Sequence, residues 1–126
     1  MVAQPADFAA LLGHEVLSYG QGRAHLRVTA SNAQRNMHGS IHGGFLYSLA
    51  DEAFALASNS RNAQAVATDT HMHYLKAVWP GDVLDVEACE LQLGNKLARY
   101  QVTLRRDQTT VALFIGTVYR SAPAAT

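Results

Sequence analysis

The chain has 126 residues, and we expect a single domain over residues 1–126 because two separate halves would each bury too little surface. Hydrophobic residues make up 48% and charged residues 16%, a composition that excludes a disordered chain. Ten basic and ten acidic residues cancel to zero net charge, so no overall field draws the protein to nucleic acid or to an anionic membrane.

Targeting and redox signals are weak. The first residues lack a basic segment followed by an apolar one, so we expect no secretory signal and, by default, a cytoplasmic protein. No apolar run approaches the ~20 residues that cross a bilayer, and the single Cys89 excludes an internal disulfide. We expect the tail, residues 121–126, to be loose.

The first predicted elements are a short helix and a hairpin. Pro5 favours a helix start, and apolar residues at helical spacing follow it as far as Gly13. Strands are predicted over Glu15–Tyr19 and Arg23–Thr29, with the glycines between them forming the turn.

One long helix follows, from Gly43 to about Asn59, and its apolar residues cover so much of its surface that it must be largely buried. Four further strands are predicted at Ala65–Val78, Val83–Leu93, Leu97–Arg106 and Thr110–Tyr119. This order predicts an α+β domain in which an antiparallel sheet curls around one central helix. Its free sheet edges favour a dimer with two-fold symmetry.

A glycine-rich stretch, 36–44, runs directly into the long helix. The adjacent Gly43 and Gly44 let another group approach the backbone closely. Unpaired amides at a helix N-terminus, aided by the helix dipole, can stabilise negative charge on a carbonyl oxygen. Taken alone, however, the glycines are explained at least as well by a tight turn.

The helix also carries an acid pair, Asp51 and Glu52, its only formally charged residues. Asp51 lies too far along the helix to cap it, and aspartate is a poor residue for a helix interior. Glu52 shares a helical stripe with Ser48 and is expected to face solvent. Asp51 flanks Tyr47 and Phe54, where a partly desolvated carboxylate can act as a base or a nucleophile.

The most specific part of the pattern is a set of motifs in fixed register: Asn36, His42-Gly43-Gly44, Leu49-Ala50-Asp51, Ala53-Phe54-Ala55 and Thr110-Val111-Ala112-Leu113-Phe114. Together they make residues 13–119 resemble the hotdog-fold acyl-CoA thioesterases, in particular the PaaI-like branch of phenylacetate degradation. The resemblance implies a hotdog fold and a hydrolase that splits an acyl-CoA thioester, with phenylacetyl or hydroxyphenylacetyl as the favoured acyl group.

The resemblance also implies roles for residues. The residue at Asp51 would activate water or attack the thioester, the Gly43 amide would bind the carbonyl oxygen, and Asn36 would help to hold that oxygen. His42 would position the motif, although a purely structural role in the turn is about as plausible. Gly44 would line the substrate site.

No cofactor or metal is implied. As a partner we expect a second copy of the chain, in a homodimer that pairs into a homotetramer as a dimer of dimers.

Two positions depart from the resemblance. Some relatives place a serine on the strand after the helix to orient water, where this chain has Ala67 followed by Thr68. Thr68 is therefore our candidate to replace that serine in the substrate-binding site. Its side chain points the other way from that of Ala67 in a regular strand. Glu52 is the reserve candidate for the catalytic carboxylate, because a sister branch uses glutamate.

A metal site is the best competing motif. Asp69, His71 and His73 alternate along one predicted strand, so their side chains share a face. We place Val66, Met72 and Tyr74 on the opposite, apolar face, and a solvated or interfacial histidine pair explains the motif more simply.

Other enzyme classes are not supported by the sequence. It lacks the Gly-x-Ser-x-Gly elbow of serine hydrolases and a glycine-rich nucleotide loop after a strand. Cys89 lies in mid-strand, where an inert buried thiol is the commoner case. A hotdog dehydratase would use a different arrangement of histidine and acid. The main alternative to a thioesterase is a non-catalytic hotdog module that binds acyl-CoA.

Overall fold

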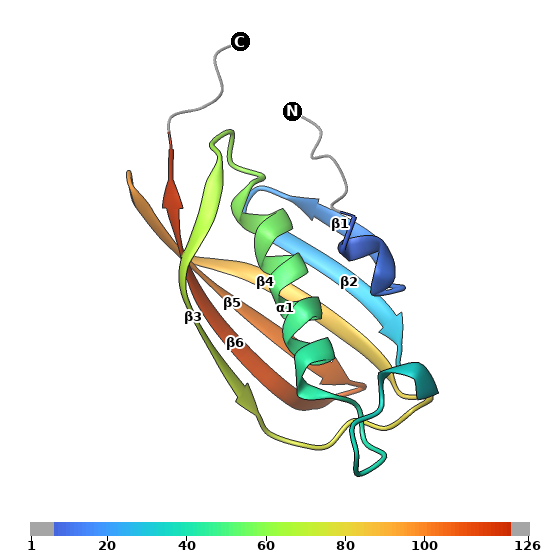
Figure 1. Ribbon diagram of the computed structural model, residues 1–126. Helices are drawn as coiled ribbons and strands as arrows, with labels where there is room; N and C mark the ends of the chain where they lie inside the picture. The colour runs from blue at the N-terminus through green and yellow to red at the C-terminus, as the bar shows by residue number, and fades with distance from the viewer. Residues whose placement is uncertain (1–6, 122–126) are drawn as a thin grey trace.

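The computed structural model describes residues 7–121 and shows a curled antiparallel sheet wrapped around one helix (Figure 1). The elements, in chain order, are η1 (Ala9–Leu11), β1 (Glu15–Gly20), β2 (Arg23–Thr29), η2 (Asn32–Gln34), α1 (Gly43–Ser58), β3 (Ala65–Tyr74), β4 (Val83–Leu93), β5 (Leu97–Arg106) and β6 (Thr109–Arg120). The predicted α+β hotdog fold is confirmed. No helix among residues 7–121 is long and apolar enough to cross a membrane.

The strands form a single sheet in the order β1-β2-β4-β5-β6-β3, and every neighbouring pair is antiparallel. The strand that follows the helix, β3, therefore lies at one edge, paired with β6 alone. Its ten residues are all exposed or only partly buried. An edge of this length offers a row of backbone groups for pairing with another strand.

The core lies between the concave face of the sheet and one face of α1. Leu49, Ala50 and Ala53 are completely buried against the sheet. Phe54 packs edge-on against Tyr100, with ring centroids 6.0 Å apart, and lies 5.2 Å from the Phe114 ring. The other face of the helix stays open, as expected for a helix that only one sheet covers.

Gly116 makes room for the aromatic cluster on the sheet. A Cβ atom at this position would lie 2.7 Å from Cζ of Phe54, closer than real carbon contacts allow. The glycine on β6 is therefore required by the ring that the helix packs onto it.

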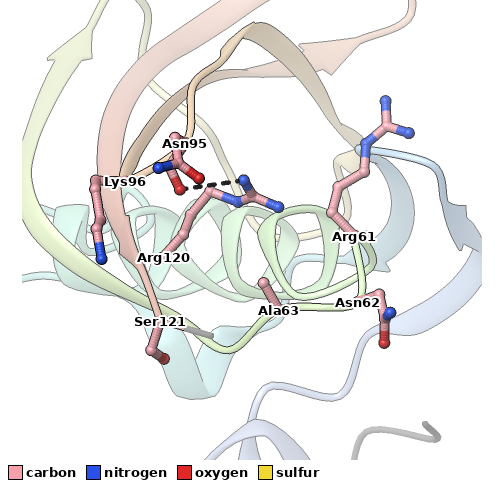
Figure 2. Close-up of a pocket in the computed structure, with 7 residues that line it drawn as sticks. All are labelled: Arg61, Asn62, Ala63, Asn95, Lys96, Arg120 and Ser121. Carbon is pink, nitrogen blue, oxygen red and sulfur yellow. Dashed lines mark hydrogen bonds between the residues drawn. The ribbon is translucent and has the colours of Figure 1, made fainter. Parts of the chain in front are cut away.

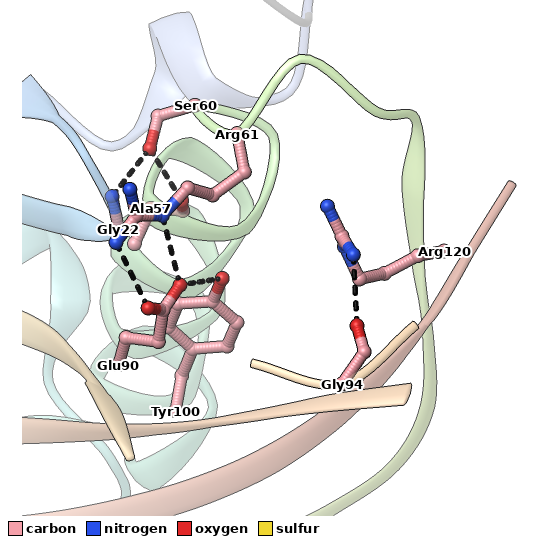
Figure 3. A network of polar contacts seen from close by, with 8 residues as sticks. All are labelled: Gly22, Ala57, Ser60, Arg61, Glu90, Gly94, Tyr100 and Arg120. Carbon is pink, nitrogen blue, oxygen red and sulfur yellow. Dashed lines mark hydrogen bonds and ion pairs between the residues drawn. The ribbon is translucent and has the colours of Figure 1, made fainter. Parts of the chain in front are cut away.

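A polar network ties the C-terminal end of α1 to the sheet (Figure 3). Arg61 donates two hydrogen bonds to the Glu90 carboxylate, and the buried Tyr100 hydroxyl donates a third at 2.9 Å. These bonds hold the pKa of Glu90 below its ordinary value, with Arg61 as the larger cause. Ser60 accepts the Gly22 amide, so the loop after the helix is fixed to the turn between β1 and β2 as well as to β4.

Two predictions about the strands need correction. The strand Ala65–Tyr74 ends four residues earlier than predicted, because the chain turns away after Tyr74. A bulge between Ala67 and Asp69 also shifts the alternation, since Ala65 and Met72 both pack against the core. The prediction that Val66 shares a face with Met72 is therefore wrong, and the Val66 side chain is 57% exposed.

The N-terminal helix is also shorter than predicted, because the described part contains only the single turn Ala9–Leu11. Pro5, which was predicted to start it, lies outside the described residues, and so does the predicted loose tail beyond Ser121.

Candidate active site

The loop before α1 is held as a compact turn. Asn36 donates from its side-chain amide to Ser40 Oγ at 2.9 Å and accepts the His38 backbone amide at 2.8 Å. The backbone of Ile41 donates to the carbonyl of Val78 at 2.7 Å, which fastens the loop to the segment after β3. One hydrogen of the Asn36 amide stays available, because the group carries two donors.

His42 is the N-cap of α1. Its Nδ1 accepts the Gly44 amide at 2.9 Å, and its carbonyl accepts the amides of Phe45 and Leu46. The bonds from Gly44 and Phe45 satisfy two of the donors that a helix leaves unpaired at its N-terminus, and the bond from Leu46 is the first regular bond of the helix. Within the described residues 7–121, Gly43 is the one residue in the first turn of α1 whose backbone amide has no acceptor. Of the two predicted glycines, Gly43 thus offers the free N–H group.

Tyr74, at the end of β3, packs over this glycine. Its hydroxyl donates to the Gly43 carbonyl at 3.0 Å, and a Cβ on residue 43 would lie 3.2 Å from two ring carbons. The peptide groups on both sides of Gly43 are therefore fixed, one by the helix turn and the other by the tyrosine. A donor held in this way needs no reorganisation when charge develops beside it.

The Gly43 backbone lines a pocket of about 310 Å³. Its walls come from the loop before α1, the first turn of the helix and the segment after β3: Asn36, Ile41, Gly43, Leu46, Tyr74, Leu75, Lys76, Ala77 and Val78. Asn36 and Gly43, predicted to act together, thus share one pocket, and Lys76 adds an exposed cation to it.

Asp51 lies on the open face of the helix and is exposed in the single chain. One turn before it, the Tyr47 hydroxyl makes a 2.6 Å hydrogen bond with Thr70 Oγ1 of β3. Residues four apart share a helix face, so Asp51 is directed toward the β3 edge. Burial by the surrounding chain nevertheless raises the pKa of its carboxyl.

Glu52 has a different setting. It is half-buried, so the prediction that it faces solvent is wrong. Burial raises its pKa most, while His14 lowers it and Asp51 raises it further. The interaction with His14, which immediately precedes β1, places Glu52 on the side of the helix away from β3. Only one of the two acids therefore faces the free sheet edge.

Asp51 lies far along α1 from the glycine turn of its own chain. Eight residues separate it from Gly43, and at ~1.5 Å per residue the two lie about 12 Å apart along the helix axis. This exceeds the reach of any group that must contact the same thioester carbon. The Gly43 turn and Asp51 are therefore two separate places on α1, one at its start and one in its middle.

The remaining predicted residues lie on β3. Thr68 is the extra residue of the bulge, and its hydroxyl donates to the Thr117 carbonyl at 3.3 Å. The His71 and His73 rings lie 4.5 Å apart. Across the described residues, no three histidine, cysteine or acidic side chains are grouped closely enough to hold a metal ion.

A second pocket, of about 470 Å³, lies at the opposite end of β3 (Figure 2). It is lined by the loop after α1, the tip of the β4–β5 hairpin and the end of β6: Arg61, Asn62, Ala63, Asn95, Lys96, Arg120 and Ser121. Sequence reasoning missed this pocket because its residues come from three segments far apart in the chain. Sequence reasoning also missed the role of Tyr74, which was predicted only to lie on the apolar face of its strand.

Comparison with known proteins gives consistent results. Residues 38–113 match the family model of the Thioesterase superfamily. The acyl-coenzyme A thioesterase PaaI of Escherichia coli (strain K12) is 37% identical over 113 residues, which cover 89% of this chain and 81% of that protein.

Two solved structures match over nearly the whole chain. A mutant structure of phenylacetic acid degradation protein PaaI from Thermus thermophilus is 40% identical, with a TM-score of 0.89, and the match covers 92% of this chain and 100% of that one. The structure of the E. coli PaaI protein is 35% identical, with a TM-score of 0.90, covering 96% of this chain and 88% of that one.

Proposed function

The chain belongs to the thioesterase superfamily, in its PaaI-like hotdog branch, and from this premise we propose that it hydrolyses arylacetyl-CoA thioesters with Asp51 as the catalytic carboxylate. Thioester hydrolysis of an acyl-CoA is the activity of the family. The choice of phenylacetyl-CoA or hydroxyphenylacetyl-CoA rests on the relatives named for phenylacetic acid degradation and on the aromatic Phe45 and Tyr47, which are partly buried at the start of α1.

The observation that carries the proposal is the unpaired Gly43 amide in a pocket at the N-terminus of α1. A thioester carbonyl oxygen in that pocket accepts this N–H group, and the helix dipole stabilises its growing negative charge. The remaining Asn36 amide hydrogen supplies a second donor. Gly44 leaves this side of the pocket free of side chains.

Asp51 supplies the second half of the chemistry. As a general base it takes a proton from water while the water oxygen attacks the carbonyl carbon; as a nucleophile it attacks that carbon itself and is released by water later. In both cases the carbon–sulfur bond breaks, and CoA leaves as a thiol. Its raised pKa makes the carboxylate a stronger base than an ordinary aspartate.

The Gly43 turn and Asp51 come together in a two-fold dimer. Pairing of the β3 edges brings the open helix faces of two chains against each other, with Asp51 of one chain opposite the Gly43 turn of its partner. Thr68, at the bulge of the same strand, would then contact substrate beside this interface. We propose a cytoplasmic homodimer, and a homotetramer built from two such dimers.

A thiol-release assay over a panel of acyl-CoA substrates tests the proposed function. We expect the highest kcat/KM for phenylacetyl-CoA or a hydroxylated form, and lower values for straight-chain acyl groups of similar size. Preference for straight chains would contradict the arylacetyl assignment. Tight binding of acyl-CoA with no thiol release would instead indicate the alternative, a non-catalytic acyl-CoA-binding module.

A further inference from the structure

Tyr74 reaches the start of α1 from the end of β3. The strand is paired with β6 at this residue, and the next two backbone amides, of Leu75 and Lys76, both donate to the Val111 carbonyl, at 2.9 and 3.1 Å. The backbone at and after the tyrosine is therefore fixed to the neighbouring strand. From this anchored position the side chain extends to Gly43 and lines the same pocket as the Gly43 backbone.

The tyrosine ring occupies the space that a side chain on residue 43 would need. A Cβ atom there would lie 3.2 Å from both Cε1 and Cζ of the ring. Glycine permits this close approach, but it also leaves the backbone dihedral angles of residue 43 loosely restrained. The ring restores part of the restraint, because it bounds Gly43 on the side where other residues carry their Cβ atom.

The tyrosine hydroxyl adds a directional restraint. It donates to the Gly43 carbonyl at 3.0 Å, and the other end of the same peptide group, the Gly44 N–H, donates to His42 Nδ1 at 2.9 Å. Hydrogen bonds linked in this way polarise and strengthen one another. The hydroxyl, the peptide group and the histidine that caps the helix therefore form one chain. Because Nδ1 is the acceptor in it, the neutral His42 ring carries its proton on Nε2.

The hydroxyl stays a donor at neutral pH. The pKa of Tyr74 lies above the ordinary value of 10.0, raised first by burial and then by the neighbouring Tyr47. The Tyr47 hydroxyl has its own partner, Thr70 Oγ1, at 2.6 Å. Within residues 7–121, Tyr74 is thus the one side chain that donates to the Gly43 carbonyl.

We propose that Tyr74 is a positioning residue for thioester hydrolysis: its ring and hydroxyl hold the Gly43–Gly44 peptide so that the free Gly43 amide stays directed at the substrate carbonyl. The inference rests on the proposed function of that amide and adds a residue that acts through it. An amide oriented before the reaction stabilises the transition state without reorganisation. Loss of the hydroxyl should therefore slow the chemical step more than it weakens substrate binding.

Tyr74→Phe tests the role of the hydroxyl, because it keeps the ring that packs on Gly43. Thiol release from phenylacetyl-CoA should fall about fivefold in kcat, the effect of losing one hydrogen bond between neutral groups, with KM unchanged. Tyr19→Phe is the matched control, since it removes the same hydroxyl from the exposed strand β1 and should change neither constant. A raised KM with unchanged kcat in Tyr74→Phe would overturn the inference.

A ketone analogue separates positioning from a purely structural role. In phenylacetonyl-CoA a methylene group stands between the carbonyl and the sulfur, so the compound binds without being hydrolysed. Its carbonyl stretching frequency, measured by infrared difference spectroscopy, should fall on binding to the wild type, because the Gly43 amide polarises the bond. The frequency should fall less on binding to Tyr74→Phe, at an equal Kd. Equal shifts in the two proteins would assign Tyr74 to stability alone and overturn the inference.

The outcomes separate this inference from the proposed function. If the wild-type protein releases thiol and Tyr74→Phe does so with the same kcat, the positioning role is wrong and the proposed function stands. If the wild-type protein releases no thiol from any acyl-CoA of the panel, the proposed function fails, and the positioning role fails with it.

Discussion

Replacing Asp51 by asparagine should affect activity and stability in opposite directions. The side chain keeps its shape but loses its charge, and it makes no hydrogen bond among the described residues. Activity should fall at least ~10²-fold in kcat, the usual effect of losing a general base. Because burial raises the pKa of Asp51, the ionised carboxylate destabilises the folded protein at neutral pH, and its removal should not lower the free energy of unfolding.

The sign of the stability effect has a pH signature. An acid whose pKa is raised on folding does not change the free energy of unfolding at a pH well below its ordinary pKa of 3.8. It lowers that free energy most at a pH above the raised pKa. The variant should therefore equal or exceed the wild type in urea unfolding at pH 7, with the difference vanishing only when the pH falls well below 3.8.

The assay is thiol release from phenylacetyl-CoA, run beside urea unfolding on the same preparations. Glu52→Gln is the matched control, since it removes the neighbouring charge from the same helix and should keep most of the activity. An active Asp51→Asn protein together with an inactive Glu52→Gln protein would transfer the catalytic role to Glu52. An Asp51→Asn protein that unfolds more readily at pH 7 would refute the stability argument.

Three further changes have defined outcomes. The kcat/KM of the wild type should fall on the acid side with an apparent pKa above 3.8, because Asp51 must be ionised; an acid limb at or below 3.8 would speak against this carboxylate. Gly43→Ala should lower kcat at least about tenfold, because the new methyl group displaces the Tyr74 ring. Adding Tyr74→Ala should recover part of the lost activity. Equal activities of Gly43→Ala and wild type would show that the turn tolerates a side chain. Tyr100→Phe should cost about 1–2 kcal/mol in urea unfolding, because the buried hydroxyl bond to the Glu90 carboxylate is lost, with kcat unchanged; an unaltered unfolding midpoint would indicate that the bond contributes nothing.

Much of the fold follows from local sequence signals. The alternation of Ala24, Leu26 and Val28 predicts one buried strand face, and all three side chains are buried in β2. The long helix was predicted to begin at Gly43, as it does, and to end within one residue of its observed C-terminus at Ser58. These signals act over a few residues, so a single sequence reveals them.

The features that sequence reasoning missed depend on contacts between distant segments. The bulge at Thr68 is set by pairing with β6, and nothing in the local composition indicates it. The exposure of Glu52 was mispredicted because helical spacing does not show that His14 lies beside it. Tyr74 gains its contact with Gly43 only when the end of β3 meets the start of α1.

The central claim is that one active site takes its amide donor and its carboxylate from two different chains. Its most direct measurement is the activity of purified mixed dimers of Asn36→Ala and Asp51→Asn chains, made by co-expression with two tags. Each mixed dimer should contain one intact site and one doubly altered site, so thiol release should return to about half the wild-type rate per dimer. Mixed dimers as inactive as both parent proteins would contradict the shared site.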